Sequence, residues 1–348
     1  MRRIETGMAG GAVAVLAVAC ALVAIDRPPA SAETRTIVDS AGRRVEVPAR
    51  IERVFAAGPP ATVLVYTVAP DKLLGWYRPL TLDERAFIPE RYLEKPTLGK
   101  LTGRSNTPNL ELVRTAKPDV ILDYGAVGLH DAALADRLQK ETGVPYVLID
   151  GRLAATPRAY RMIGDLLGVS GRAEELARYA ERALADVETR VARVPAGARP
   201  GVYYARAPRG LQTEIIETIE ALGARNVADG TIERGPLVSV TLDQVVGWNP
   251  DVIVTIDREF AAAVRADPAW QAVKAVRDGR IYKIPPVPWS WLDLPPSANR
   301  LLGLRWLGRA LYPALFPEDL RAEARRFYAL FYHRAPDDAQ LDALLDSR

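Results

Sequence analysis

Short apolar segments alternate with longer helical patterns along most of the chain. The strand-length apolar runs are Arg53–Ala57, Leu73–Trp76, Val120–Leu122, Tyr146–Ile149, Gly201–Tyr204, Val252–Thr255 and Ile281–Ile284. Continuous apolar strands are buried on both faces, and strands separated by helices pair in parallel. Residues 36–47 predict an opening hairpin around Gly42. The pattern therefore predicts an α/β protein with parallel sheets.

One segment predicts an unusually long helix, from Arg172 to Val194. Pro195 and Pro200 follow it, and its apolar residues fall at helical spacing: Leu176, Tyr179, Ala180, Leu184, Val187 and Val191. Such a helix would be about 34 Å long, enough to span a domain. We expect it to act as a rigid strut that restricts hinge closure. Two more helices are predicted, one capped by Ser297 and ending near Leu311, and one from about residue 318 to 332.

The chain contains an internal repeat. Residues 111–121 recur as residues 243–253, with an offset of 132 positions, and each copy begins with an acid and ends in Pro-Asp-Val-Ile. Thr107 and Ser239 are also 132 positions apart and are predicted N-caps. Pro-Asp-Val-Ile alone is a common helix-to-strand turn. The matched acid, cap and register together predict two similar α/β lobes.

The N-terminal segment has the order of a secretory signal. Arg2 and Arg3 precede an apolar run over residues 8–25, and Ala30-Ser31-Ala32 follows as a cleavage site. We expect cleavage after Ala32 and a periplasmic protein. The only cysteine, Cys20, would permit a lipid anchor, but the apolar run continues past it, which favours a plain signal peptide. Removal of the first 32 of 348 residues would leave 316 without cysteine.

Charge and composition exclude two kinds of site. The formal net charge is only +3, which argues against nucleic-acid binding. The two histidines, His130 and His333, are far apart in sequence, and a bare transition metal needs several His, Cys, Met or carboxylate ligands. His130 is expected to be a surface residue beside Asp131. The alternative is that it coordinates an open position of a bound chelate.

Several motifs are those of a known family. They are Val38–Arg43, Asn109–Glu111, Lys117–Ile121, Ala275–Tyr282 and Pro295–Gly303. With these motifs the chain resembles the class III (cluster A-II) periplasmic binding proteins, which serve ABC importers of ferric siderophores, haem, cobalamin and some oxyanions. The last motif resembles the subgroup of molybdate or tungstate binders and iron-transport proteins. The match extends over essentially all of the mature chain.

The resemblance implies a domain organisation. It implies two Rossmann-like lobes joined by a single long helix, with the ligand cleft between them. The corresponding boundaries are a signal peptide at residues 1–32, an N-terminal lobe at 33–165, the spanning helix at 166–195 and a C-terminal lobe at 196–348. We also expect a monomer that delivers a small molecule to a permease with a cytoplasmic ATPase.

The same resemblance assigns Glu111 and Asp243 to permease docking, one on each lobe. The family usually has Glu at the second position, and Asp reaches one methylene less. The alternative is that both acids only stabilise the first turn of a helix through its dipole.

Ligands of α/β sheets bind beyond the carboxyl ends of the strands. The loops there contain residues suited to an anionic, partly aromatic ligand, because guanidinium groups match oxyanions and aromatic rings form flat walls. The predicted ligand contacts are Tyr77, Arg78, Tyr124, Tyr204, Arg206, Arg209, Trp289 and Trp291. The alternative is that these are ordinary surface arginines and packing aromatics. A tyrosine could also bind iron directly through its phenolate.

Four functions were compared. Capture of an anionic metal chelate such as a ferric siderophore is favoured by the five aromatic candidates, and capture of molybdate or tungstate is the close alternative. The sequence contains no G-x-S-x-G, H-E-x-x-H or P-loop motif, so we expect no enzyme and no intrinsic cofactor. A binding module that signals rather than transports stays open.

Overall fold

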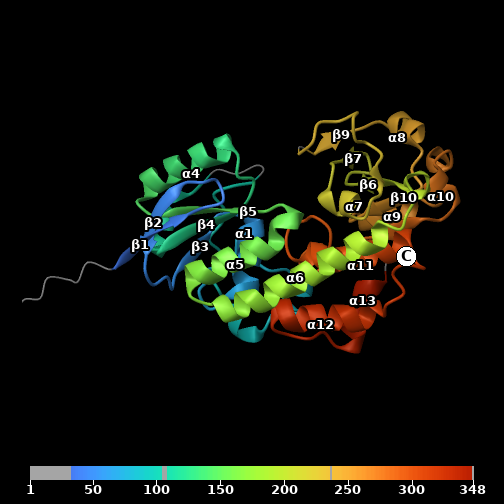
Figure 1. The fold of residues 1–348 in the computed structure, drawn as a ribbon. Coiled ribbons are helices and arrows are strands. Elements are labelled where there is room, and N and C mark those ends of the chain that lie inside the picture. Colours follow the sequence, from blue (N-terminus) through green and yellow to red (C-terminus); the bar gives the residue numbers. More distant parts are fainter. Residues whose placement is uncertain (1–32, 104–107, 236, 347–348) are drawn as a thin grey trace, which may run out of the picture.

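The computed structural model describes residues 33–103, 108–235 and 237–346. The predicted signal peptide and Cys20 lie outside these residues. Two groups of strands stand apart, and a long helix runs along both (Figure 1). Each group is a parallel sheet, so the predicted two-lobed α/β architecture is confirmed.

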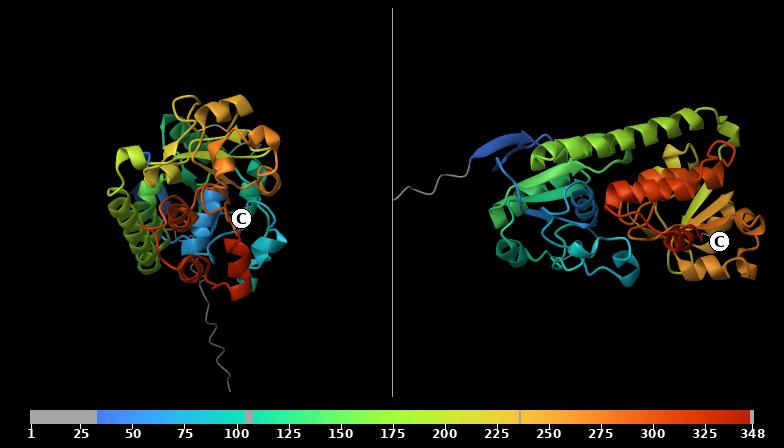
Figure 2. Two further views of the ribbon diagram at one scale, coloured as in Figure 1. Left: turned by 90° about the vertical axis from the view of Figure 1, so that its right-hand side faces the viewer. Right: turned by 90° about the horizontal axis from the view of Figure 1, so that it is seen from below.

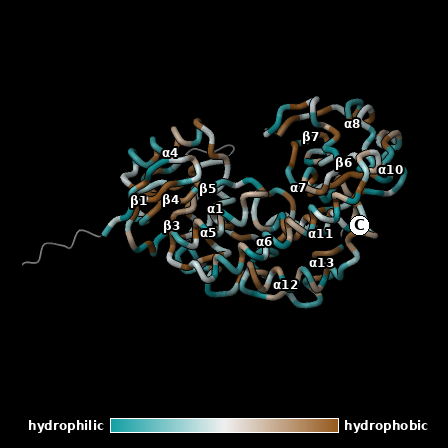
Figure 3. Tube along the Cα trace, viewed as in Figure 1, coloured by the Kyte–Doolittle hydropathy of each residue, from teal (hydrophilic) through white to brown (hydrophobic). Residues whose placement is uncertain are grey.

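The N-terminal lobe contains a hairpin and a three-stranded parallel sheet of order β3-β4-β5. Its strands are β1 (Thr34–Val38), β2 (Arg44–Pro48), β3 (Val54–Ala56), β4 (Val120–Gly125) and β5 (Tyr146–Asp150). Its helices are α1 (Pro59–Val68), α2 (Leu82–Arg85), α3 (Leu110–Ala116), α4 (Leu129–Thr142) and α5 (Thr156–Leu167). Apolar residues are concentrated in the sheet strands (Figure 3), as the continuous apolar runs predicted.

The C-terminal lobe contains a parallel sheet of order β11-β10-β6-β8 and a small antiparallel pair, β7 with β9. The strands are β6 (Gly201–Ala205), β7 (Gln212–Thr213), β8 (Arg225–Asn226), β9 (Val238–Ser239), β10 (Val252–Thr255) and β11 (Ile281–Lys283). The helices are α7 (Glu217–Ala221), α8 (Leu242–Trp248), α9 (Arg258–Ala263) and α10 (Lys274–Arg277).

The repeat is a structural one. α3 with β4 and α8 with β10 form the same helix, turn and strand unit, and both helices end in a left-handed residue, at Lys117 and Asn249. The predicted caps are wrong in position. Asn109 and Thr241, again 132 apart, cap the helices by accepting from backbone N–H groups at 3.1 and 3.2 Å.

The capping error has a local cause. Ser239 is occupied in β9, where it pairs with Gln212, so its chain is extended and the helix begins only at Leu242. Thr107, the other predicted cap, lies outside the described residues. The acids Glu111 and Asp243 therefore lie in the first turns of their helices.

The predicted strut is α6 (Ser170–Val191), a helix of 22 residues that begins two residues before its predicted start. It runs along both lobes (Figure 2). Leu176, Tyr179, Ala180, Val187 and Val191 are buried on one face, as the spacing predicted. At its start it crosses α5 closely, because a side chain on Gly164 would collide with Ala173.

Three C-terminal helices follow: α11 (Asn299–Leu311), α12 (Leu320–Tyr332) and α13 (Asp338–Leu345). The predicted cap of α11 is one residue off, since Ala298 is the N-cap and caps without a side chain, whereas Ser297 accepts from the Asn299 N–H at 3.4 Å. Helix α13 was not predicted from the sequence. No helix among the described residues is long and apolar enough to cross a bilayer.

The largest apolar core is shared by the two lobes. The Tyr66 hydroxyl of α1 donates to the backbone oxygen of Tyr332 at 3.1 Å. Trp289 of the C-terminal lobe stacks on Tyr332 at 5.8 Å and packs against Trp76 at 5.9 Å between ring centroids. Since aromatic rings of both lobes pack together, the connection between the lobes is stiff.

Candidate functional site

A pocket of about 530 Å³ lies at the carboxyl ends of β3 and β4. It is lined by small and apolar residues together with a few polar and charged side chains: Pro59, Pro60, Leu101, Thr102, Gly103, Pro108, Asp123, Tyr124, Gly125, Ala126, His130, Asp131, Leu134 and Arg137. This is the edge of a parallel sheet at which α/β proteins bind ligands. We take it as the candidate ligand site.

Three features of the pocket suit an anion. The ten-residue helix α1 begins there with no side-chain cap, so the positive end of its dipole faces the pocket, although Pro59 and Pro60 at its first two positions have no N–H to donate. His130 and Arg137 have no ion-pair partner among the described residues. The absence of a side chain at Gly58 lets the loop that contains Thr102 pack against the start of α1, because a Cβ on Gly58 would lie 2.9 Å from Thr102 Oγ1.

The floor of the pocket carries an acid, Asp123, at the end of β4. Its Oδ2 accepts from the Tyr146 hydroxyl at 2.9 Å, and its Oδ1 accepts from Thr102 at 3.4 Å. It has no cationic partner among the described residues. Burial raises the pKa of Asp123, and the hydroxyl donors oppose that shift only in part.

Of the predicted ligand contacts in the N-terminal lobe, only Tyr124 lines this pocket, and its side chain is only 2% exposed. Arg78 is held by Glu84, with Nη1 2.8 Å from Oε2, and its guanidinium lies 5.2 Å from the Tyr77 ring centroid. The ion pair raises the pKa of Arg78. Its guanidinium fork is therefore already occupied by a carboxylate.

In the C-terminal lobe, Arg206 is paired with Glu214 and lies over the ring of Tyr204, at 5.8 Å from its centroid. Tyr204 is completely buried. Arg209, with φ of 57°, is exposed and has no partner among the described residues, so it is the one predicted arginine whose guanidinium is free.

The predicted tryptophans are in the core. Trp289 is 2% and Trp291 0% exposed, and the Trp291 Nε1–H donates to the Tyr328 hydroxyl at 2.9 Å. Four of the five predicted aromatic contacts are thus enclosed by protein. Three of them, Tyr124, Tyr204 and Trp289, have a buried polar atom without a protein partner, which is uncommon in folded proteins. Their contact with a ligand stays a prediction.

Two partly buried polar contacts join the lobes. Arg300, 3% exposed, donates to the Gly151 oxygen at 2.7 Å and lies 3.4 Å from Glu217. Glu217 in turn accepts from the Leu153 N–H at 2.5 Å. Gly151 and Leu153 follow β5 of the N-terminal lobe, whereas Glu217 and Arg300 belong to α7 and α11. These two hydrogen bonds therefore hold the lobes together at one end of their interface.

Replacing Arg300 with methionine is expected to lower the free energy of unfolding by about 2 kcal/mol, because it leaves the Gly151 oxygen without its donor and Glu217 without its cation. Urea unfolding followed by tryptophan fluorescence measures the change. Arg182→Met, at an exposed position of α6, is the control and should change stability by less than about 0.5 kcal/mol. Equal stability of the two variants would contradict a stabilising contact of Arg300 between the lobes.

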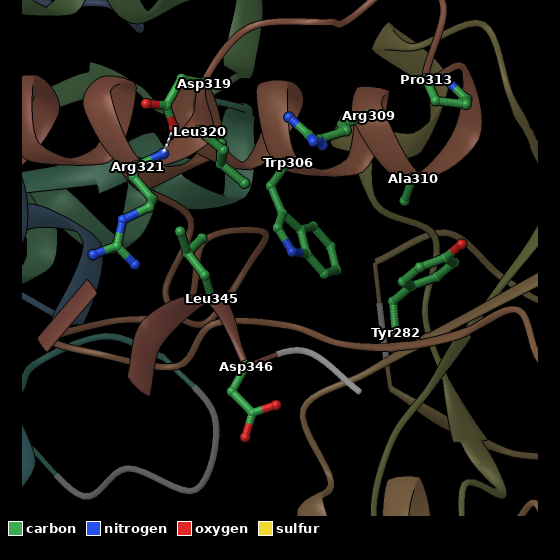
Figure 4. Close-up of a pocket in the computed structure, with 10 residues that line it drawn as sticks. All are labelled: Tyr282, Trp306, Arg309, Ala310, Pro313, Asp319, Leu320, Arg321, Leu345 and Asp346. Atoms are coloured by element: carbon green, nitrogen blue, oxygen red, sulfur yellow. Dashed lines mark hydrogen bonds between the residues drawn. The ribbon is translucent and has the colours of Figure 1, made fainter. Parts of the chain in front are cut away.

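Two other cavities lie away from the carboxyl ends of β3 and β4. One of about 460 Å³ lies between α2, α13 and the ends of β10 and β11, where Asp83 and Asp346 offset the charges of Arg258 and Lys283. The other, of about 590 Å³, is walled by Tyr282 and Trp306 (Figure 4). Its Arg321 is neutralised by Asp338 and Asp342.

Metal and docking predictions can also be located. No group of three or more His, Cys, Asp or Glu side chains in the described part of the chain could hold a metal ion. His333 is a left-handed cap residue near Tyr66, and burial lowers its pKa. Glu111 is largely exposed and 3.4 Å from Arg114, and Asp243 is exposed. Both acids are accessible to a partner.

Five residues of these sites were not predicted from the sequence: Asp123, Thr102 and Arg137 in the pocket, and Arg300 and Glu217 between the lobes. A signal for Asp123 was present, since it directly follows the buried run Val120–Leu122 at a strand end. The other four carried none, because they become neighbours only through the fold.

Two parallel α/β lobes, a long connecting helix and a pocket at strand ends define a solute-binding protein of the two-lobed class. The model of the family described as "Periplasmic binding protein" matches residues 84–288, and the chain belongs to this family. The resemblance inferred from the motifs is thereby confirmed.

Three relatives are informative. The molybdate-binding protein MolA of Haemophilus influenzae is 27% identical over 343 residues, covering 88% of this chain and 93% of MolA. The iron(3+)-hydroxamate-binding protein FhuD of Escherichia coli is 26% identical over 219 residues, covering 60% and 71%. A solved ABC transporter solute-binding protein from Sulfurospirillum deleyianum has a TM-score of 0.82 at 28% identity, covering 89% of this chain and 99% of that one.

Proposed function

We propose that this protein is the periplasmic substrate-binding component of an ABC importer and that it captures a small oxyanion of the molybdate type. It is exported by the signal at residues 1–32 and delivers its ligand to a permease. The observation that carries the proposal is the pocket at the ends of β3 and β4, which combines the positive end of the α1 dipole, a hydroxyl and the side chains of His130 and Arg137, neither of which has an ion-pair partner within the described part of the chain. MolA, which matches 88% of the chain, supports the same ligand class.

The burial of the aromatic side chains favours an oxyanion over a siderophore as the ligand. A siderophore needs a wide aromatic wall, and the five aromatic candidates were the reason to favour one. With Tyr124, Tyr204, Trp289 and Trp291 enclosed, that reason is lost. An oxyanion needs a small set of donors, which the pocket has.

A ferric chelate is the second candidate. The volume of about 530 Å³ exceeds what a bare oxyanion fills, and FhuD, at 26% identity, is named for an iron(3+)-hydroxamate. Mass spectrometry of the ligand released from natively purified protein distinguishes the two classes directly. A released siderophore would overturn the oxyanion proposal.

Molybdate or tungstate is expected to raise the melting temperature by about 5 °C at a hundredfold excess over Kd, since that excess stabilises a folded protein by about 2.7 kcal/mol. Thermal-shift titration against molybdate, tungstate, sulfate and a ferric hydroxamate measures the effect. A shift with the hydroxamate alone would favour the second candidate, and no shift with any anion would contradict both.

Arg137→Gln is expected to weaken oxyanion binding about tenfold, because it removes a cation from the pocket rim. Arg182→Gln is the matched control: it removes an exposed helical arginine that lines none of the pockets described above. Isothermal titration of both variants measures the difference. Equal affinities would exclude this pocket as the oxyanion site.

A further inference from the structure

Asp123 is out of place in a pocket for an anion. It lies at the floor and is partly exposed to the pocket, and it has no cationic partner among the described residues. An ionised carboxylate there would repel an oxyanion bound in the same pocket. The cation Arg137 and the side chain of His130 come from α4 and lie at the exposed rim rather than beside the acid.

The hydrogen bonds of Asp123 leave acceptor capacity for a ligand group. Tyr146 and Thr102 each donate to a different oxygen, whereas a carboxyl group has about four acceptor sites. With a proton on either oxygen, the group becomes a donor to the pocket and keeps both existing bonds. The same arrangement can accept from a ligand hydroxyl while Asp123 is ionised.

We propose that capture of an oxyanion in this pocket takes up one proton from solvent, which is shared between Asp123 and the bound anion. The proposal rests on the proposed function and adds that binding of the ligand is coupled to the binding of a proton. In one form the Asp123 carboxyl donates to a fully deprotonated oxyanion, and in the other the carboxylate accepts from a protonated one. Both complexes contain the same number of protons, and no other bond is made or broken.

The environment of Asp123 favours this coupling. Burial already raises its pKa in the free protein, and a bound anion raises it further, since it disfavours the second negative charge. Between the free and the bound pKa, one proton enters with each ligand. Affinity should therefore increase as the pH falls, by at most about tenfold per pH unit.

Other charged groups face the same space and must be separated from Asp123. Asp131 accepts from the Gly128 N–H at 2.9 Å, and His130 and Arg137 lie on the same helix. Tyr146 of β5 has its pKa raised by burial and by Asp123, with Arg43 opposing the shift. Lys100 adds a cation next to Gly103. Asp293 of the C-terminal lobe has its pKa raised to about 7 by burial, but it does not line the pocket.

Isothermal titration with molybdate and with sulfate, between pH 6 and 8 and in two buffers of different ionisation enthalpy, counts the protons taken up. The wild-type protein should take up close to one, and Asp123→Asn should take up none, because the amide donates at every pH. Asp293→Asn, at a position outside the pocket, should keep the uptake. An uptake of zero in the wild-type protein, or its loss in a control variant but not in Asp123→Asn, would overturn the proposal.

A second variant covers the case in which Asp123→Asn does not fold or bind. Tyr146→Phe removes the hydroxyl that stabilises the ionised carboxylate, so the midpoint of the pH dependence should move upward. An unchanged midpoint would contradict the assignment to Asp123. If neither anion binds at any pH, the proposed function itself fails, whereas binding that is independent of pH overturns only the proton uptake.

Discussion

Gly303→Ala is expected to lower the free energy of unfolding by about 3 kcal/mol. Gly303 lies in the middle of α11, where a Cβ would overlap the carbonyl oxygen of Trp291 and lie 2.8 Å from its carbonyl carbon. The obstacle is backbone rather than a flexible side chain, so the helix or the loop before it must shift, and overpacked cores typically lose 1–3 kcal/mol or more. Because the residues around Trp291 also join the lobes, the loss should affect the whole molecule.

Urea unfolding of Gly303→Ala and of a control measures this. The control is Gly171→Ala in α6, where a Cβ meets nothing within 4 Å. There the substitution should be neutral or stabilise by up to about 1 kcal/mol, because alanine favours the helix over glycine. If Gly303→Ala is as stable as the Gly171→Ala variant, the close contact between α11 and the loop at Trp291 is not present in solution.

The elements of the fold were predictable where local pattern and tertiary role agree. The apolar runs became the buried strands β4, β5, β6 and β10, and the spacing in residues 172–194 became α6. The repeat was predicted too, but its caps were two residues off, because pairing of Ser239 in β9 is a tertiary effect that the local pattern at the helix start does not contain. For the same reason α13 was not predicted: Gln340 fixes it by donating to the Ala86 oxygen, which is 254 positions away.

The site was predictable only by position along the strands. The rule that ligands bind at strand ends led to Tyr124. Its neighbour Asp123 is the residue to which the proton uptake is assigned. Neighbouring residues of a strand point to opposite faces, and here Tyr124 packs into the shared core while Asp123 faces the pocket with Thr102. Which face a ligand occupies depends on the surrounding helices, and that information is absent from a single strand.

Reversing the charges of Glu111 and Asp243 together, to arginine, is expected to reduce ligand uptake about 100-fold while ligand affinity stays unchanged. Both acids are exposed in the first turns of equivalent repeat helices. If each meets an arginine of a permease, the double variant places like charges opposite each other, at a cost of several kcal/mol. Uptake of radioactive molybdate by cells carrying each variant, with isothermal titration of the purified proteins, separates delivery from binding.

The competing explanation is that the two acids only complement helix dipoles. That effect amounts to about 1 kcal/mol or less at exposed positions and would lower the melting temperature without a specific effect on delivery. Glu259→Arg is the matched control, since Glu259 is an exposed first-turn acid of α9. It should show the dipole effect alone and keep normal uptake. If the double variant transports as well as Glu259→Arg does, the two acids only complement helix dipoles, and the permease contacts another part of the surface.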